Sequence, residues 1–328
     1  MGQHEEIING KIEAGIFKSL SQQAYRKFPA VNHSLLRILH EGKSPAHLRE
    51  HFLYPPEQET SLLQGEAFHV KMCEPEEFSK HFEVAQECNG TLQKRRADGS
   101  ISCSKLGVGI NAEGKQYCSN HWNIFVGRDY PSEKKILPPS AMRMIDGMVE
   151  TLGRDSLVTG LMQSIPPENR EVSVVADHPY YKVNGEPLKM KARFDAMLSL
   201  NCKGNIPVKN GDLNTLIDFK TTRSASGKDF PWTVKKYHYD KQAAHYLSVA
   251  NQAFKKFGYK FENFIIIAVE KERPYVHQTF RVRDEQIETS NVFVEEALEV
   301  YRSCLEDKFW PGYSPGQLIT LGTSSEEI

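Results

Sequence analysis

The stretch TLIDFKTT, residues 215–222, constrains this chain more than any other. Within its apolar run, Asp218 and Lys220 are separated by a single position. Side chains alternate between the faces of a strand, so we expect Asp218 and Lys220 to share one face. Ile217 and Phe219 then point into a core on the other face. A buried acid beside a buried amine is costly unless each has a partner, which indicates a site for a cation or an anion.

Further polar residues accompany this strand in other segments. Asp195 lies in the strand-like run KARFDAML, and Glu171 begins another, EVSVVA. His69 lies in QGEAFHVKM, which has the pattern of a helix. Gln242 and Tyr246 are four positions apart in a helical segment, so they share one helical face. Each residue alone is more often a surface charge or a core side chain, but the ordered set predicts a divalent-metal site.

Such a site is typical of phosphodiester hydrolysis. Two hard cations about 4 Å apart can activate a water and stabilise the leaving oxygen, and Mg²⁺ or Mn²⁺ takes mainly oxygen ligands. We expect Lys220 beside the attacking water or the scissile phosphate, with Gln242 and Tyr246 positioning it or holding a nucleic-acid backbone. The expected metal ligands are Asp195, Asp218, the carbonyl of Phe219, Glu171 and His69.

The composition neither requires nor excludes a nucleic-acid partner. The 328 residues carry a formal net charge of −1, with 39% hydrophobic and 25% charged residues, as in ordinary globular proteins. Positive charge for binding DNA would therefore have to be concentrated in a groove. No apolar run is long enough to span a bilayer, and the N-terminus has no apolar signal segment. We expect a cytoplasmic protein without a membrane partner.

Hydrophobic periodicity predicts the other elements. Asn32 or Ser34 is expected to cap a helix that runs to Leu39, and Pro45 to open the next one. The other expected helices are 5–20, 64–72, 140–152, 157–162, 232–257 and 286–305. The other expected strands are 171–176, 180–183, 191–200, 264–271 and 277–283.

Residues 83–135 differ in composition and are expected to be an insertion outside the main core. Cys88, Cys103 and Cys118 are separated by fourteen residues each, and His121 follows Cys118 by three positions. Three cysteines and a histidine make a complete tetrahedral Zn²⁺ set, which would be structural because no position stays open. The alternative, three unrelated buried thiols in an ordinary loop, remains open.

The order of the motifs resembles the nuclease domain of the exonuclease VIII family of phage and prophage recombination exonucleases, within the PD-(D/E)xK superfamily. The segments that carry the resemblance span residues 20–79 and 136–313. They are LSQQAY, VNHSLLRIL, LLQGEAFHVKMCEPEEF, LIDFKTT, YHYDKQAAHY and FWPGY. One difference is Phe194, which precedes Asp195 where the family usually has proline.

The resemblance implies an α/β restriction-endonuclease-like core with a mixed sheet flanked by helices. It implies a helical N-terminal part at 1–82, the insertion at 83–135, the nuclease core at 136–313 and a tail at 314–328. It also implies that five residues form the metal and catalytic site, with Gln242 and Tyr246 in its helical part. These five are His69, Glu171, Asp195, Asp218 and Lys220.

The family degrades one strand of linear double-stranded DNA from its 5′ end, uses Mg²⁺, and leaves a 3′ single strand for an annealing protein. The resemblance therefore implies a phage- or prophage-encoded exonuclease in a bacterial host, assembled as a homo-oligomeric ring. Ser34, near a helix start, and Arg37 are candidates for binding a DNA phosphate. Alternatives are an endonuclease or single-strand-directed repair nuclease of this superfamily, or a catalytically silent protein that binds DNA ends.

Overall fold

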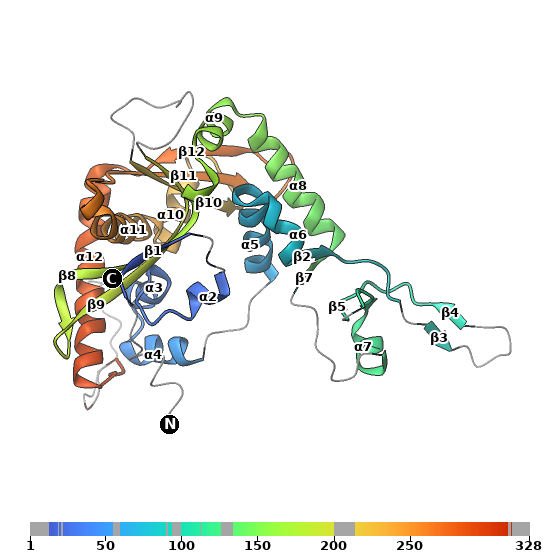
Figure 1. The fold of residues 1–328 in the computed structure, drawn as a ribbon, viewed down its shortest axis with the longest axis horizontal. Helices are drawn as coiled ribbons and strands as arrows, with labels where there is room; N and C mark the ends of the chain where they lie inside the picture. Colours follow the sequence, from blue (N-terminus) through green and yellow to red (C-terminus); the bar gives the residue numbers. More distant parts are fainter. Residues whose placement is uncertain are drawn as a thin grey trace, which may run out of the picture.

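The computed structural model describes residues 13–18, 20, 22–54, 60–89, 91–93, 100–111, 113–125, 134–199, 214–313 and 316. Its centre is a six-stranded sheet in the order β1-β8-β9-β10-β11-β12 (Figure 1). Neighbouring strands are antiparallel except β10 and β11, which are parallel. The strands are β1 (Gly15–Phe17), β8 (Arg170–Val183), β9 (Glu186–Leu198), β10 (Thr215–Thr222), β11 (Asn263–Glu270) and β12 (His277–Arg281).

Helices cover both faces of this sheet, which confirms the predicted α/β class. Two groups of helices pack on opposite faces of the sheet, and each group shares its own apolar core with the sheet. The first group is α3 (His33–His40), α4 (Pro45–Leu53), α10 (Phe230–Tyr237), α11 (Tyr239–Phe254) and α12 (Asp284–Asp307). The second is α5 (Thr60–Cys73), α8 (Pro139–Gly153) and α9 (Ser156–Ser164).

Strand β10 has the predicted bounds and alternation. Ile217 and Phe219 are buried in the core that α5, α8 and α9 share with the sheet, whereas Leu216 is buried in the core on the α11 side. Asp218 and Lys220 therefore share the α11 face, as expected from the strand period. The neighbour β11 is nearly all apolar and buried because it lies between two other strands.

Strands β9 and β10 separate where the polar residues lie. They pair only from Thr215 to Ile217, while β10 continues along β11 to Thr222. Phe194 and Ala196 lie in opposite cores although residues two apart in a regular strand share a face. The strand is therefore irregular at Asp195, the residue between them. The ladder between the two strands therefore ends before Phe219, and this unpaired stretch is here called the gap between β9 and β10.

Several elements differ from the sequence predictions. The helix expected over 5–20 is replaced, in its described part, by β1, because Ile16 and Phe17 gain an edge position beside β8. Strand β8 is one strand with an irregularity between Asp177 and Lys182, not two strands. The helix expected over 232–257 is two helices, because His238 adopts a left-handed conformation with φ 56°.

The N-terminal part follows its predicted caps and adds two short helices. Asn32, not Ser34, caps α3, because its side chain accepts a hydrogen bond from the amide of Leu35. Pro45 opens α4 as predicted. The remaining helices are α2 (Gln22–Arg26) before α3 and α6 (Phe78–His81) after α5. No helix in the described ranges is long and apolar enough to cross a membrane.

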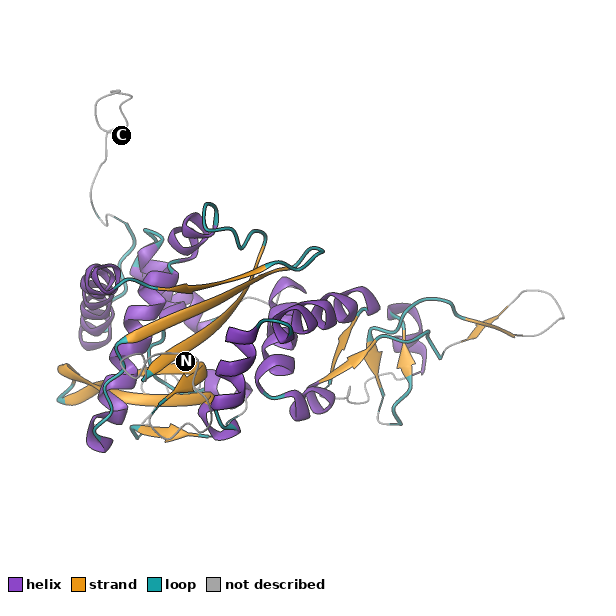
Figure 2. Cartoon of the chain, turned by 90° about the horizontal axis from the view of Figure 1, so that it is seen from above, coloured by secondary structure: helices purple, strands orange, loops and turns teal. Residues whose placement is uncertain are grey.

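Residues 83–135, here called the arm, extend away from the sheet and its helices (Figures 1 and 2). The base of the arm is a parallel pair of strands, β2 and β7. Two hairpins and a short helix follow from this base. Its elements are β2 (Phe82–Val84), β3 (Thr91–Gln93), β4 (Ser100–Ser102), β5 (Gly109–Ile110), β6 (Gln116–Tyr117), α7 (Ser119–Phe125) and β7 (Lys135–Leu137).

Lys191 joins the N-terminal segment to β9. Its Nζ donates to the carbonyls of Tyr25, Arg26 and Phe28 at 3.2, 3.3 and 2.7 Å, and the residue is 3% exposed. Burial lowers the pKa of this amine to about 8, so it is still charged at neutral pH. These contacts add a charged donor to carbonyls at and beyond the end of α2, where the regular helical ladder has stopped.

We expect Lys191→Met to lower the free energy of unfolding by about 2–4 kcal/mol, because it leaves these carbonyls without their charged donor. Urea unfolding would measure the change. Lys189→Met is the matched control on the same strand, since Lys189 pairs at the surface with Asp177. Its loss should cost about 0–1 kcal/mol. An equal decrease in the free energy of unfolding in the two variants would contradict a stabilising role for the buried Lys191 contacts.

Candidate active site

Three side chains from different elements meet at the gap between β9 and β10. His69 reaches from α5, Glu171 from β8 and Asp195 from β9, and their ligand atoms lie within 4.8 Å of one another. The Nδ1 of His69 is 3.1 Å from Oδ2 of Asp195. Both acids are buried, with 7% and 8% of their surfaces exposed. Two buried carboxylates beside an imidazole form a donor set for a divalent cation.

The backbone of β10 helps to fix Asp195. The amide of Phe219 donates to Oδ2 of Asp195 at 2.7 Å. Because β9 has left the ladder at this level, this amide bonds a side chain in place of a strand partner. The N–H and C=O of one residue in a strand point to the same side, so the Phe219 carbonyl also faces the gap.

Asp218 forms a separate group on the α11 side of the same gap. Its Oδ2 lies 2.6 Å from Nζ of Lys220, and its Oδ1 accepts from Nε2 of Gln242 at 2.9 Å. The aromatic ring of Tyr239 covers the amine, with Nζ 4.8 Å from the ring centroid. The structure thus brings Asp218, Lys220 and Gln242 together as predicted, but outside the group of His69, Glu171 and Asp195.

Glu171 is held by an arginine that the sequence analysis did not single out. The Nε of Arg193 donates to Oε2 of Glu171 at 2.6 Å, and its Nη1 donates to Oγ of Ser173 at 3.1 Å. Glu171 has a positive φ of 48°, which is uncommon outside glycine and is often found at functional sites. Arg193 lies two positions before Asp195, a spacing that could have drawn attention to it, but its role depends on the contact with Glu171 on the neighbouring strand.

Electrostatics connects the two groups. Burial alone would lower the pKa of His69, but Asp195 outweighs it and raises that pKa to about 9. Burial and the nearby Asp195 raise the pKa of Glu171 to about 7. Burial opposes ionisation of Asp195, yet His69, Lys220 and the Phe219 amide lower its pKa. A divalent cation would therefore take the place of the protons on His69 and Glu171 in balancing the buried charge of Asp195.

The lysine stays charged in this environment. Burial acts to lower the pKa of Lys220, but Asp218, Tyr239 and Asp195 raise it above its ordinary value. At neutral pH the amine is therefore a cation and a hydrogen-bond donor. A charged amine next to the gap is suited to stabilise negative charge on a phosphate, and not to accept a proton.

The remaining predicted residues are Tyr246 on α11 and Ser34 and Arg37 on α3. Tyr246 packs edge-on against Phe194, with ring centroids 5.5 Å apart, and burial raises its pKa well above the usual range. Phe194 thus fills space against α11. Ser34 is exposed on α3. Arg37 pairs with Glu41 at 3.3 Å.

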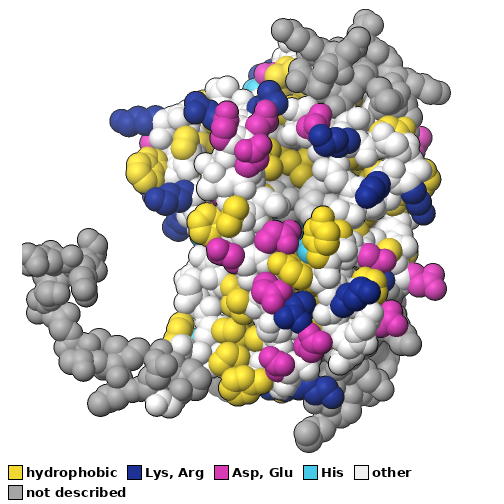
Figure 3. All heavy atoms as spheres, turned by 90° about the vertical axis from the view of Figure 1, so that its left-hand side faces the viewer, with side chains coloured by type: hydrophobic (Ala, Val, Ile, Leu, Met, Phe, Trp, Pro, Cys, Tyr) yellow, Lys and Arg dark blue, Asp and Glu magenta, His cyan; other side chains and the backbone are white. Residues whose placement is uncertain are grey.

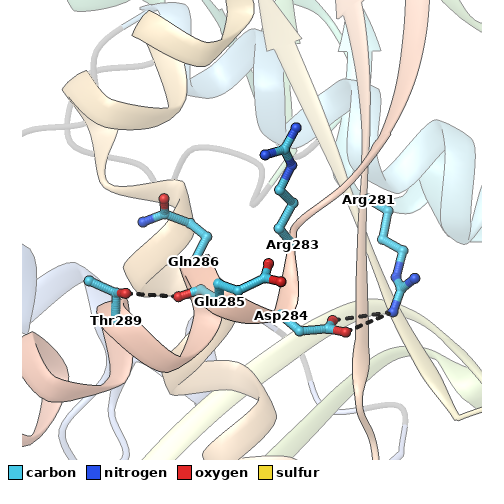
Figure 4. A pocket seen from close by; sticks show the side chains of 6 residues that line it. All are labelled: Arg281, Arg283, Asp284, Glu285, Gln286 and Thr289. Carbon is cyan, nitrogen blue, oxygen red and sulfur yellow. Dashed lines mark hydrogen bonds and ion pairs between the residues drawn. The ribbon is translucent and has the colours of Figure 1, made fainter.

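Other surface features do not share these residues. A depression at the junction of β12 and α12 is lined by exposed residues, and Arg281 pairs there with Asp284 at 3.2 Å (Figure 4). None of the site residues lines it. On the face shown in Figure 3, basic and acidic side chains are interspersed without a patch of one sign. The gap between β9 and β10 is therefore the candidate site.

The fold and this site define a nuclease domain of the PD-(D/E)xK type. The order of Asp195, Asp218 and Lys220 on two antiparallel strands of a mixed sheet, with Glu171 on the strand before, is the arrangement of that class. The family described as "PDDEXK-like domain of unknown function" matches residues 33–317, and the chain belongs to it. Nucleases of this class use divalent metals, and DNA is the substrate that such a domain implies.

Two further comparisons add little. No curated relative matches the chain. A crystal structure of a protein from Eubacterium rectale with the provisional name of exonuclease is similar over 94% of this chain and 96% of that one. The two share 14% sequence identity, with a TM-score of 0.47. The family and the geometry of the site together define the class of this protein.

Proposed function

We propose that the protein is a Mg²⁺-dependent exodeoxyribonuclease that degrades one strand of linear double-stranded DNA, in the 5′-to-3′ direction. The observation that carries the proposal is the meeting of His69, Glu171 and Asp195 within 4.8 Å beside the Asp218–Lys220 pair. The segments shared in order with the exonuclease VIII family support the exonucleolytic mode and its direction. The expected product is a 3′ single strand for an annealing protein.

The donor set fits hard divalent cations. The carboxylates of Glu171, Asp195 and Asp218 and the carbonyl of Phe219 are oxygen donors of the kind that Mg²⁺ prefers. His69 adds a nitrogen, which Mn²⁺ also accepts. Bound cations would supply a water of lowered pKa and positive charge at the phosphate. We propose two ions of Mg²⁺ or Mn²⁺ held by these residues.

The protein's own groups would position the reaction. Gln242 fixes Asp218 through a 2.9 Å hydrogen bond, and Arg193 fixes Glu171. Lys220, held charged beneath the ring of Tyr239, would donate to the scissile phosphate or orient the attacking water. The buried phenol of Tyr246 keeps its proton, so it serves packing and can donate a hydrogen bond but does not act as a base.

Helix α3 is proposed as the wall that contacts the DNA end. Burial lowers the pKa of His33, and the charges of the nearby Lys220 and Arg37 lower it further. The start of α3 therefore lies in the positive field beside Lys220. Ser34 is exposed there, so its hydroxyl and Arg37 are proposed to contact a DNA phosphate. A homo-oligomeric ring around the DNA is proposed on the resemblance alone, as are the phage or prophage origin and a cytoplasmic location.

A second metal is proposed for the arm. Cys88, Cys103, Cys118 and His121 form the other group of potential ligands among the described residues. Thiolates favour Zn²⁺ over Mg²⁺, which prefers oxygen. Zn²⁺ is therefore proposed for this group.

The test of function uses purified protein, Mg²⁺ and three DNA substrates. We expect 5′-labelled linear duplex to release its label early, 3′-labelled duplex to release it late, and covalently closed circular duplex to stay intact. Cleavage of the circle would instead establish an endonuclease. Stable binding of ends without product would establish a catalytically silent end-binding protein.

Metal binding should release protons from the site. His69, with its pKa raised from 6.5 to about 9, holds a proton at neutral pH, and Glu171, with a pKa of about 7, holds part of one. A metal ligand must be deprotonated, so affinity for Mn²⁺ should rise with pH across this range. Calorimetric titration in two buffers of different ionisation enthalpy would measure the release. His69→Gln should reduce it, and equal heats in both buffers would contradict the ligand assignment.

A further inference from the structure

We infer that the Cys88–Cys103–Cys118–His121 group is a closed zinc site that folds the arm, and that losing the metal unfolds the arm while the nuclease core stays folded. The inference does not depend on the proposed nuclease activity. It concerns residues that the catalytic site does not use. The four ligands come from three places in the arm: the stretch after β2, the stretch after β4, and the end of β6 with the first turn of α7.

The distances fit tetrahedral zinc. Zn–S bonds of about 2.3 Å and a Zn–N bond of about 2.0 Å place two sulfurs about 3.8 Å apart, and a sulfur and a nitrogen about 3.5 Å apart. In the arm, Sγ of Cys103 and Cys118 are 4.0 Å apart. Nδ1 of His121 is 3.6 Å from Sγ of Cys118 and 3.2 Å from Sγ of Cys88. All four side chains are buried, so water does not compete for the site.

Backbone amides point at the sulfurs, as they do where thiolates bind a metal. The amide of Cys118 donates to Sγ of Cys88 at 3.2 Å. The amide of Lys105 donates to the sulfur of Cys103, and the amide of Asn120 to that of Cys118. In both cases the donor is two residues beyond the cysteine. Amide hydrogen bonds stabilise the negative charge that a thiolate carries, and they orient the ligands.

The arm has little else to hold it together. In its described part, the arm's own core cluster is Cys88, Cys103, Tyr117 and Cys118, with Trp122 packed against it. Three of these four buried residues are proposed ligands. A segment of this size does not reach a stable fold on so small an apolar core, and such modules commonly depend on a metal. Removing the metal therefore removes the main source of folding free energy for the arm.

The link from the site to the base of the arm is Gln116, which is 1% exposed. Its Nε2 donates to the carbonyl of Val84 at 3.0 Å, and its Oε1 accepts from the amide of Gln86 at 2.7 Å. Gln116 lies two positions before Cys118, so β2 and the metal site share one hydrogen-bonded unit. The arm should therefore lose its order from the metal site down to this base.

Other uses of the cysteines fit less well. A disulfide would use two thiols and leave a third cysteine buried next to His121, and none of the three cysteines is in a disulfide. A catalytic zinc would need an open ligand position, and this set supplies all four. The group is therefore structural.

The test measures metal content and local order in the full-length protein. Elemental analysis should find about one zinc per chain, and Co²⁺ in its place should give the intense visible bands of tetrahedral cobalt with thiolate charge transfer. Chelation should raise hydrogen exchange in residues 85–89, 100–111 and 113–122 and leave β9, β10 and β11 unchanged. Zn²⁺ should restore the protection. Substoichiometric zinc, an octahedral cobalt spectrum, or unchanged exchange after removal of the metal would overturn the inference.

Matched variants localise the effect. Cys103→Ser and Cys118→Ser should each lose the zinc, whereas Cys304→Ala, which removes a buried thiol of α12, should keep it. If both serine variants kept one zinc per chain, the metal would have to bind at another site, and the proposal would be overturned. These readouts are independent of DNA cleavage, so failure of the nuclease proposal and failure of the zinc proposal can be told apart.

Discussion

Replacing Asp195 with asparagine should lower Mg²⁺-dependent cleavage of linear duplex DNA by about 10³-fold or more. A cation at the gap loses a buried carboxylate ligand, and the several kcal/mol that a metal ion contributes to the transition state correspond to a factor of this size. Binding of Mn²⁺ should weaken together with activity. Rates on end-labelled DNA and a calorimetric metal titration would measure the two effects.

This variant should stay folded, which makes its loss of activity interpretable. The amide oxygen of asparagine has the place of a carboxylate oxygen, so it can still accept the 2.7 Å hydrogen bond from Phe219. The pKa of His69, now about 9, should fall, because Asp195 is the group that raises it. An NMR titration of the imidazole would report that change.

The matched control is Asp177→Asn. Asp177 is also an acid on a strand of the sheet, but it is half-exposed on β8 and pairs with Lys189 instead of with a histidine of the site. This control should retain nearly full activity. Equal activity in the wild type and Asp195→Asn would show that the Asp195 carboxylate is not needed for DNA cleavage.

The sequence predicted the parts of this site that depend on local pattern. The period of TLIDFKTT predicted the faces of Asp218 and Phe219, and the structure confirms the bounds of β10. The cap at Asn32 and the proline at the start of α4 are local signals too. Such features depend on neighbours a few positions away, so a single sequence contains them.

The sequence analysis did not predict features that depend on contacts between residues far apart in the chain. The chain from Gly15 to Phe17 has apolar residues that suit a helix, but pairing with β8 makes it a strand. The pattern of α10 and α11 continues through His238, although the backbone breaks there. The role of Arg193 follows only from its distance to Glu171 across two strands. Strand pairing overrides local periodicity in such cases.

The sequence also did not predict that the acids divide into two groups. Asp195 and Asp218 were predicted as equal metal ligands, yet Asp195 joins His69 and Glu171 while Asp218 is bound by Lys220 and Gln242. The cause is the break of β9 at Asp195. It leaves one acid in the gap between the strands and the other on the α11 face.

Lys220→Met should lower kcat about 10²–10³-fold, while the concentration of Mg²⁺ needed for half-maximal rate should stay the same or fall. The loss in kcat is the size found when one donor to a developing negative charge is removed. The metal should not bind more weakly, because the variant removes a positive charge that lies 2.6 Å from Asp218. Half-saturation by Mg²⁺ and single-turnover rates would separate the two effects.

This outcome distinguishes a catalytic amine from a structural one. If Lys220 only balanced the charge of Asp218, excess Mg²⁺ would replace it and restore the rate. If the amine contacts the reacting phosphate, excess Mg²⁺ would leave the rate low. Lys189→Met removes an amine that pairs with Asp177 at the surface, and it should change neither quantity. Recovery of Lys220→Met at high Mg²⁺ would therefore assign the lysine to the charge balance of the buried acid instead of to the chemical step.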